Sequence, residues 1–161
     1  MRRLRFCRRS AVAENTADVR LLDQPFAPEQ ALGAFAKANP ASGGVASFIG
    51  LVRPGVTALE LSHYEPLTLP GMKALARAAL ARSPLDALLV WHRVGLMQPG
   101  DPIVLVAAAA QHRRAAIEAV DFTMDHLKAA AWFWKREQRG GEWHWIEPRP
   151  EDHADLARWN A

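Results

Sequence analysis

Lys128 and Lys135 are the residues of this chain whose type and spacing best suit chemistry. They lie seven positions apart in the segment DHLKAAAWFWKRE, residues 125–137. The chain has four lysines against sixteen arginines, so a position that needs only a positive charge usually carries arginine. An amine can be partly desolvated, lose its proton and act as a base or a nucleophile, which a guanidinium cannot do. Two of the four lysines in one short segment therefore suggest a specific task.

Ordinary structural roles for this segment stay open on pattern alone. Lys128 could complement the C-terminus of a helix and pair with Asp125 or Asp121, which is worth roughly 0.3 kcal/mol. The aromatic residues between the lysines are most simply core or interface material, and the alternative is stacking on a flat heterocycle. Whether the two amines converge on one substrate depends on how the chain folds back after the helix.

A second set of cations could bind an anion. His112 and Arg113 open a predicted long helix, where free backbone N–H groups and the helix dipole favour a negative charge such as a phosphate. Arg53 follows a predicted buried strand and precedes the tight turn Pro54-Gly55, so a rigid element would hold it as a second anion ligand. The alternatives are that His112 merely caps a surface helix and that both arginines are solvated charges.

The elements around the lysines follow from periodicity. From His112 to Leu127 apolar residues recur at three- and four-residue spacing, which predicts a long amphipathic helix. After Ala131 the period changes to two, so a strand that carries Lys135 should follow. The RGG turn then predicts a hairpin to the strand EWHWIE.

Turn and strand signals divide the rest of the chain. Pro28 and Asn39-Pro40 bound a first helix. The segment GGVASFIGLVR is apolar on both alternations, which predicts a strand buried on two faces, and the alternating TALELSHYE is its predicted hairpin partner. We also expect a helix over 69–83 with Pro70 and Gly71 at its start, a strand-turn-strand hairpin over 87–110 and a short helix over 149–159.

This order of helices and paired strands predicts a single α+β domain with a mainly antiparallel sheet built from hairpins. The predicted domain covers residues 19–161. Residues 1–18 form an arginine-rich leader that we expect to be disordered, with a targeting or RNA-contacting role as the alternative.

Composition excludes several classes of protein. At 161 residues and 50% hydrophobic content the chain can bury a sizeable core, and it contains no apolar run long enough for a membrane span. Five arginines of the leader account for more than the net charge of +3, so the domain itself lacks the basic surface of a nucleic-acid-binding protein. One cysteine and six scattered histidines predict no disulfide, no metal site and no cofactor, and a reducing cytoplasm fits this.

Five segments, taken together in their order and spacing, carry a resemblance to a known family. They are GGVASFIGLVR, LELSHYEP, WHRVGLMQPGD, AAQHRRAAIEAVDFTMDHLKAAAWFWKRE and GEWHWIE. From about Val19 to Trp159 the chain resembles the large subunit of molybdopterin synthase, the MoaE family. Trp132 stands where this family usually has a proline.

The resemblance implies an α/β hammerhead-type fold and a sulfurtransferase. Such a subunit takes sulfur from the C-terminal Gly-Gly thiocarboxylate of a small ubiquitin-like, MoaD-like partner and adds it to cyclic pyranopterin monophosphate, making the molybdopterin dithiolene. It also implies a central homodimer within a heterotetramer. By the same resemblance Lys128 and Lys135 are catalytic, and Arg53, His112 and Arg113 bind the anionic pterin. We expect Lys128 to lie closest to the thiocarboxylate and Lys135 to assist at the pterin.

Two other functions would use the same residues differently. A non-catalytic module could hold an acidic C-terminal tail or a phosphorylated ligand with these cations and transfer no sulfur. A small RNA-binding domain would rely on the leader and on exposed tryptophans, and its affinity would fall steeply with salt.

Overall fold

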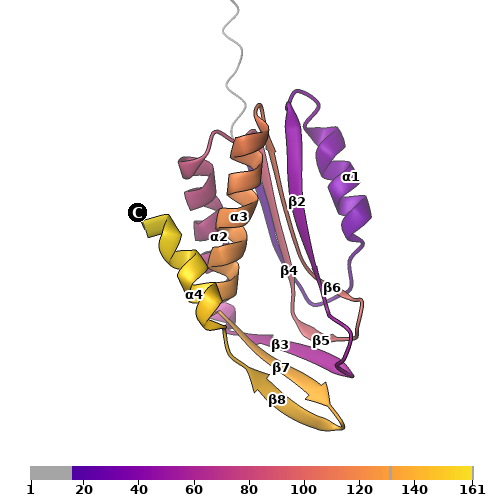
Figure 1. Ribbon diagram of the computed structural model, residues 1–161. Helices are drawn as coiled ribbons and strands as arrows, with labels where there is room; N and C mark the ends of the chain where they lie inside the picture. Colours follow the sequence, from indigo (N-terminus) through magenta and orange to yellow (C-terminus); the bar gives the residue numbers. More distant parts are fainter. Residues whose placement is uncertain (1–15, 131, 161) are drawn as a thin grey trace, which may run out of the picture.

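The computed structural model describes residues 16–130 and 132–160, which form two four-stranded sheets flanked by helices (Figure 1). The first sheet has the strand order β1 (Thr16–Leu22), β4 (Ala87–Arg93), β6 (Pro102–Ala110), β2 (Gly44–Leu51). The second has the order β5 (Gly95–Met97), β3 (Ala58–His63), β7 (Phe133–Arg139), β8 (Glu142–Ile146). The helices are α1 (Pro28–Ala38), α2 (Glu65–Arg82), α3 (Arg113–Ala129) and α4 (Pro150–Ala157), and a 3₁₀ turn, η1, covers Arg158–Asn160.

The main core lies on both faces of the first sheet. α2 and α3 cover one face and α1 covers the other (Figure 1). The central strand β6 ends in four alanines, Ala107–Ala110, which are fully buried. Their small side chains let helices pack closely on both sides of the strand. A smaller core on the second sheet, built around Leu61 and Met97, supports the end of the molecule where the lysines lie.

The α+β class, the single domain and the mainly antiparallel pairing are confirmed. β7 pairs with β8 in antiparallel register, as the last hairpin predicted, and β4 pairs with β6 as expected for the segment 87–110. The predicted strand over 87–97 is divided, however, because its last residues form β5, which pairs with β3 in the second sheet. The QPGD turn therefore connects the two sheets and does not close a hairpin. Gly140 and Gly141 both have positive φ, 57° and 87°, which explains the sharp RGG turn. The long helix and the short C-terminal helix are also present as α3 and α4.

The predicted hairpin between residues 43–53 and 57–65 is wrong. β2 pairs with β6 in the first sheet, and β3 pairs with β5 and β7 in the second. The turn at Pro54-Gly55 carries the chain from one sheet to the other instead of reversing it. β2 is also not buried on two faces, because it is an edge strand and four of its apolar side chains are exposed: Val45, Phe48, Ile49 and Leu51.

Two boundaries differ from the sequence-based expectation. α2 begins at Glu65 rather than near Pro70, which lies inside the helix. β1, which pairs in parallel with β4, was not predicted. It begins at Thr16, three residues before the predicted start of the domain, and the rest of the predicted leader lies outside the described residues. Among the helices in the described ranges, none is long and apolar enough to cross a membrane.

Candidate active site

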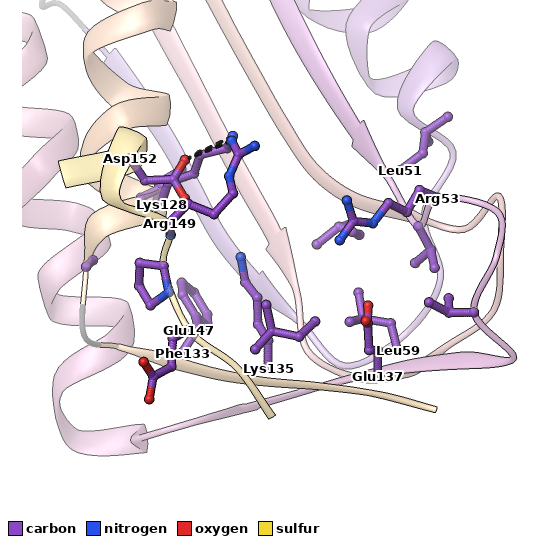
Figure 2. Close-up of a pocket in the computed structure, with 17 residues that line it drawn as sticks. Leu51, Arg53, Leu59, Lys128, Phe133, Lys135, Glu137, Glu147, Arg149 and Asp152 are labelled. Carbon is purple, nitrogen blue, oxygen red and sulfur yellow. Dashed lines mark hydrogen bonds and ion pairs between the residues drawn. The ribbon is translucent and has the colours of Figure 1, made fainter. Parts of the chain in front are cut away.

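A pocket of about 350 Å³ opens between the second sheet and the ends of α3 and α4 (Figure 2). Three of the five predicted site residues line it: Arg53, Lys128 and Lys135. They come from the segment after β2, the last turn of α3 and the middle of β7. Figure 2 shows the Lys135 amine between Arg53 on one side and Lys128 with its neighbours on the other. The structure therefore brings both lysines to one cavity, although a helix and a strand carry them.

Strand alternation aims Lys135 into the pocket. Phe133, Lys135 and Glu137 all line the cavity, whereas Trp134 between them is 49% exposed. Phe133 stacks on the buried imidazole of His92, with ring centroids 4.1 Å apart. Lys135 thus stands on a strand whose inner face is anchored to the first sheet through β4.

Trp132 holds the junction between α3 and β7. Its carbonyl accepts hydrogen bonds from the Tyr64 N–H at 3.4 Å and from the Thr68 hydroxyl at 3.3 Å. Its indole lies directly over Gly71 of α2, where a methyl group would come within 2.5 Å of the ring. α3 still ends at Ala129, and Ala130 is extended with φ −69° and ψ 132°. Packing against α2 therefore fixes the change from helix to strand without a proline at position 132.

Lys128 forms an ion pair with Asp152, with 3.7 Å between Nζ and Oδ1. The lysine side chain is about half exposed (45%), and the Asp152 side chain is nearly buried (11%). The pairing with Asp121 or Asp125 that helical spacing suggested is not formed, because both carboxylates bind Arg158 instead. Lys128 is consequently held by a residue 24 positions later in the chain.

Burial lowers the pKa of Lys135 below that of an ordinary lysine, and the nearby charge of Lys128 lowers it further. The carboxylate of Asp152 acts in the opposite direction and raises it. Burial also lowers the pKa of His92 to about 4, so its imidazole is neutral at physiological pH. The Lys135 amine can therefore give up its proton more readily than a lysine in water.

Arg53 is positioned by the backbone just before it. The Val52 N–H donates to the Asp101 carbonyl at 2.9 Å, and the Val52 carbonyl accepts from the Gly100 N–H at 2.8 Å. The exposed guanidinium of Arg53 points toward the pocket in Figure 2. A cation on a fixed backbone is suited to binding an anion that enters the cavity.

His112 and Arg113 do not reach this pocket. Both are exposed at the opposite end of α3, where His112 is the N-cap residue. Arg113 precedes Lys128 by fifteen residues, which is about 23 Å along a helix axis. Their turn is held by the Gln111 amide, which donates to the Ala41 carbonyl at 3.0 Å and to Asp86 at 3.1 Å.

Four charged pocket residues were not predicted: Glu137, Glu147, Arg149 and Asp152. Glu137 lies two residues after Lys135, so the period-two pattern places it on the same face of the strand. Arg149 and Asp152 begin α4 in a capping box, in which the Arg149 N–H donates to Asp152 Oδ2 at 3.0 Å. The RPED segment signals a helix start, but nothing local in it indicates which helix it will pack against.

Most of the chain matches one protein family. Residues 21–130 match the family model described as MoaE protein, and this range includes Arg53, His112, Arg113 and Lys128. The chain belongs to the MoaE family. Its relatives also cover the segment with Lys135. The molybdopterin synthase catalytic subunit of Caulobacter vibrioides is 43% identical over 145 residues, which cover 88% of this chain and 97% of that protein.

Solved structures of MoaE proteins share the fold. The MoaE protein from Burkholderia ambifaria has 38% sequence identity and a TM-score of 0.77, covering 90% of this chain and 99% of that one. A chain of the complex of subunits 1 and 2 of molybdopterin-converting factor from Helicobacter pylori has a TM-score of 0.70. It covers 81% of this chain and 91% of that one. At 19% identity this second likeness shows the fold alone.

Proposed function

We propose that this MoaE chain is the catalytic subunit of a molybdopterin synthase, a sulfurtransferase of molybdenum cofactor biosynthesis. In this role it transfers sulfur from the C-terminal thiocarboxylate of a small ubiquitin-like, MoaD-like partner to cyclic pyranopterin monophosphate, forming the dithiolene. The observation that carries the proposal is the pocket in which a partly desolvated Lys135 lies beside Lys128 and Arg53.

The chemistry of the reaction suits these side chains. The thiocarboxylate, the cyclic phosphate and the oxyanions that form during acyl and sulfur transfer are all negative. Fixed cations in a partly dry cavity stabilise such charges more than water does. Lys128 is the more exposed of the two lysines and is the one that we expect to meet the incoming thiocarboxylate. Lys135 lies deeper, and its lowered pKa allows it to move a proton at the pterin.

The small partner is part of the proposal. The Helicobacter pylori structure is named as a complex of subunits 1 and 2 of molybdopterin-converting factor, and one of its chains has this fold. A narrow extended tail is the kind of ligand that a cavity of about 350 Å³ with a cationic wall can admit. The cytoplasmic location also remains a proposal, which rests on the single cysteine of the chain.

We further propose a homodimer in which His112 and Arg113 of one protomer complete the pocket of the other. β2 begins at Gly44, which pairs with Ala110, two residues before His112 in the chain. It ends at Leu51, which lines the pocket. Eight strand residues span about 23 Å, which is the same length as the separation of Arg113 from Lys128 along α3. A two-fold axis across the middle of β2 would therefore place the anion-binding end of one protomer at the pocket of its mate.

The exposed surface of β2 supports this dimer. An edge strand offers unpaired backbone groups, and this one also exposes Val45, Phe48, Ile49 and Leu51. A second copy of the chain would cover the same apolar patch on both protomers, as an isologous interface does. The apolar strand that was predicted to be buried within one domain would then be buried between two.

Reconstitution tests the function directly. Purified chain, thiocarboxylated small partner and cyclic pyranopterin monophosphate should yield dithiolene product, and Lys128→Ala and Lys135→Ala should each abolish most of it. Lys37→Ala and Lys73→Ala are matched controls, because these exposed lysines lie on α1 and α2. Wild-type rates from both pocket variants would show that the site is wrongly assigned. No product from the wild-type chain with a competent partner would favour the non-catalytic binding module.

A further inference from the structure

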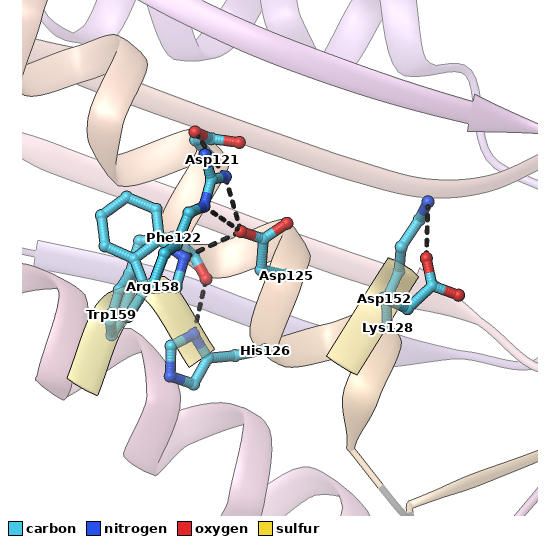
Figure 3. A network of polar contacts seen from close by, with 8 residues as sticks. All are labelled: Asp121, Phe122, Asp125, His126, Lys128, Asp152, Arg158 and Trp159. Atoms are coloured by element: carbon cyan, nitrogen blue, oxygen red, sulfur yellow. Dashed lines mark hydrogen bonds and ion pairs between the residues drawn. The ribbon is translucent and has the colours of Figure 1, made fainter. Parts of the chain in front are cut away.

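α4 and the 3₁₀ turn after it are bound to α3 at two separate points (Figure 3). At the pocket end, Asp152 contacts Lys128. At the far end, Arg158 and Trp159 contact Asp125, which lies one helical turn before Lys128 on α3. The C-terminal segment therefore binds the same face of α3 that carries the pocket lysine.

The carboxylate of Asp152 is held in place before it meets Lys128. Its Oδ2 accepts the backbone N–H of Arg149 at 3.0 Å, and its Oδ1 accepts the Arg149 guanidinium at 3.3 Å. Partial burial raises the pKa of Asp152, but these bonds and the charge of Lys128 outweigh burial and leave the pKa lowered. Asp152 is thus a fixed anion at neutral pH, located where α4 begins.

The contacts of Arg158 and Trp159 with Asp125 are more extensive than a surface ion pair. The nearly buried Asp125 carboxylate accepts from Arg158 at 2.7 and 3.1 Å and from the Trp159 indole N–H at 2.8 Å. Arg158 also pairs with Asp121 at 2.8 Å, and the Trp159 ring packs edge-on against Phe122 with centroids 5.4 Å apart. Several bonds to one carboxylate restrict the position of η1, and through it that of α4.

We propose that Asp152 is a positioning residue for the catalytic lysines: it holds the Lys128 amine at the pocket wall, and the bonds of Arg158 and Trp159 to Asp125 keep α4 where Asp152 can do so. The activity consequences rest on the proposed function, whereas the structural consequences do not. Without Asp152 the Lys128 side chain, already half exposed, would lose its fixed partner.

Asp152 also balances the charges around Lys135. Burial and the charge of Lys128 lower the pKa of Lys135, and the carboxylate of Asp152 raises it. Replacing Asp152 by a neutral residue should therefore lower the pKa of Lys135 further. The other titratable groups around the lysines come from the segment after β2, from β4, from β7 and from the segment after β8: Arg53, His92, Glu137, Glu147 and Arg149.

The test uses the small number of lysines in the chain. In protein labelled with ¹³C-lysine, four side-chain signals are expected, which Lys→Arg substitutions assign. Asp152→Asn should lower the titration midpoint of Lys135 and increase the mobility of the Lys128 methylene groups measured by relaxation. The signals of Lys37 and Lys73 should not change. Asp155→Asn, an exposed carboxylate on the same helix, is the matched control and should leave all four signals unchanged.

Two further variants distinguish a role of Asp152 in positioning the lysines from a role in folding α4. Asp152→Glu keeps the charge and should restore most of the Lys135 midpoint. Trp159→Phe keeps an aromatic ring but loses the N–H bond to Asp125, and should increase Lys128 mobility while circular dichroism shows α4 still folded. An unchanged Lys135 midpoint and unchanged Lys128 mobility in Asp152→Asn would overturn the proposal.

Sulfur transfer provides the second readout. Asp152→Asn should slow dithiolene formation about tenfold, mainly in kcat, because a misplaced amine binds the tail but acts on it poorly. If the lysine signals change as expected while even the wild-type chain makes no product, Asp152 positions the lysines and the proposed function is wrong. If the wild-type chain is active and Asp152→Asn changes neither signals nor rate, the function stands and the positioning role does not.

Discussion

The imidazole of His92 and the ring of Phe133 stack with their centroids 4.1 Å apart and their planes 15° apart. His92 belongs to β4 of the first sheet and Phe133 to β7 of the second, so this stack joins the two sheets beneath the pocket. The His92 Nδ1–H donates to the Arg93 carbonyl at 2.9 Å, which fixes the neutral ring in one orientation. The position of Lys135, two residues after Phe133, depends on this contact.

The neutral state of His92 predicts a loss of stability in acid. The pKa of His92 is lowered from 6.5 to about 4. Between these two pH values the imidazole is mostly protonated in the unfolded chain but mostly neutral in the folded chain, so folding becomes less favourable as the pH falls. The stability lost between pH 6.5 and 4 should be about 3 kcal/mol from this residue. Urea unfolding of the wild-type chain at several pH values in this window measures the loss.

Two variants isolate the contribution of His92 to this acid effect. His92→Phe retains a ring against Phe133 without a titrating group, so its stability should depend less on pH in the same window. His153→Gln removes an exposed histidine from α4 and should retain the wild-type dependence. Equal pH dependence in His92→Phe and the wild-type chain would show that His92 is not the residue responsible.

Gly71→Ala should destabilise the protein, although alanine favours a helix more than glycine does. The added methyl group would lie 2.5 Å from the Trp132 indole, and forcing such a contact costs about 1 to 3 kcal/mol. Because Trp132 precedes β7, the variant should also slow sulfur transfer. Thermal unfolding and the dithiolene assay measure the two effects.

Gly33→Ala is the matched control for that substitution. Gly33 lies inside α1, where an added methyl group meets no atom within 4 Å. Helix propensity alone should then stabilise the protein by about 0.5 to 1 kcal/mol. If both variants were equally stabilised, the contact between Gly71 and Trp132 would not restrict the junction.

Local patterns predicted the parts of this structure that local physics determines. The period change after Ala131 located β7, and the RGG turn located the hairpin to β8. The partner of β2 was predicted wrongly because its apolar residues are compatible with any neighbouring strand, and pairing with β6 is a long-range contact. Likewise, Asp121 and Asp125 were reasonable helical partners for Lys128, but Arg158 binds both. Asp152 reaches Lys128 only through the packing of α4 on α3, which no pattern near either residue encodes.

Lys135→Arg should separate the charge of Lys135 from its ability to lose a proton. The variant keeps a cation in the pocket, so binding of the small partner should change little. Guanidinium does not deprotonate, so if Lys135 moves a proton, the rate of dithiolene formation should fall about a hundredfold or more.

In the wild-type chain the rate should rise with pH and level off at a lower pH than an ordinary lysine would give, because burial lowers the pKa of Lys135. A fully active Lys135→Arg variant would mean that the residue acts only as a fixed charge.

Mixing two inactive variants should restore activity if the pocket is completed across a dimer. Lys128→Ala lacks the pocket amine, and Arg113→Ala lacks a cation at the far end of α3. In a mixed dimer one pocket carries both defects, but the other combines an intact Lys128 with the intact Arg113 of the partner subunit. Random exchange of subunits should therefore recover about a quarter of the wild-type sites. If His112 and Arg113 served the pocket of their own chain, every pocket in the mixture would carry one defect and no activity would return.

Adding Phe48→Asp to both variants should prevent recovery, because a charge on the exposed face of β2 would block the proposed interface.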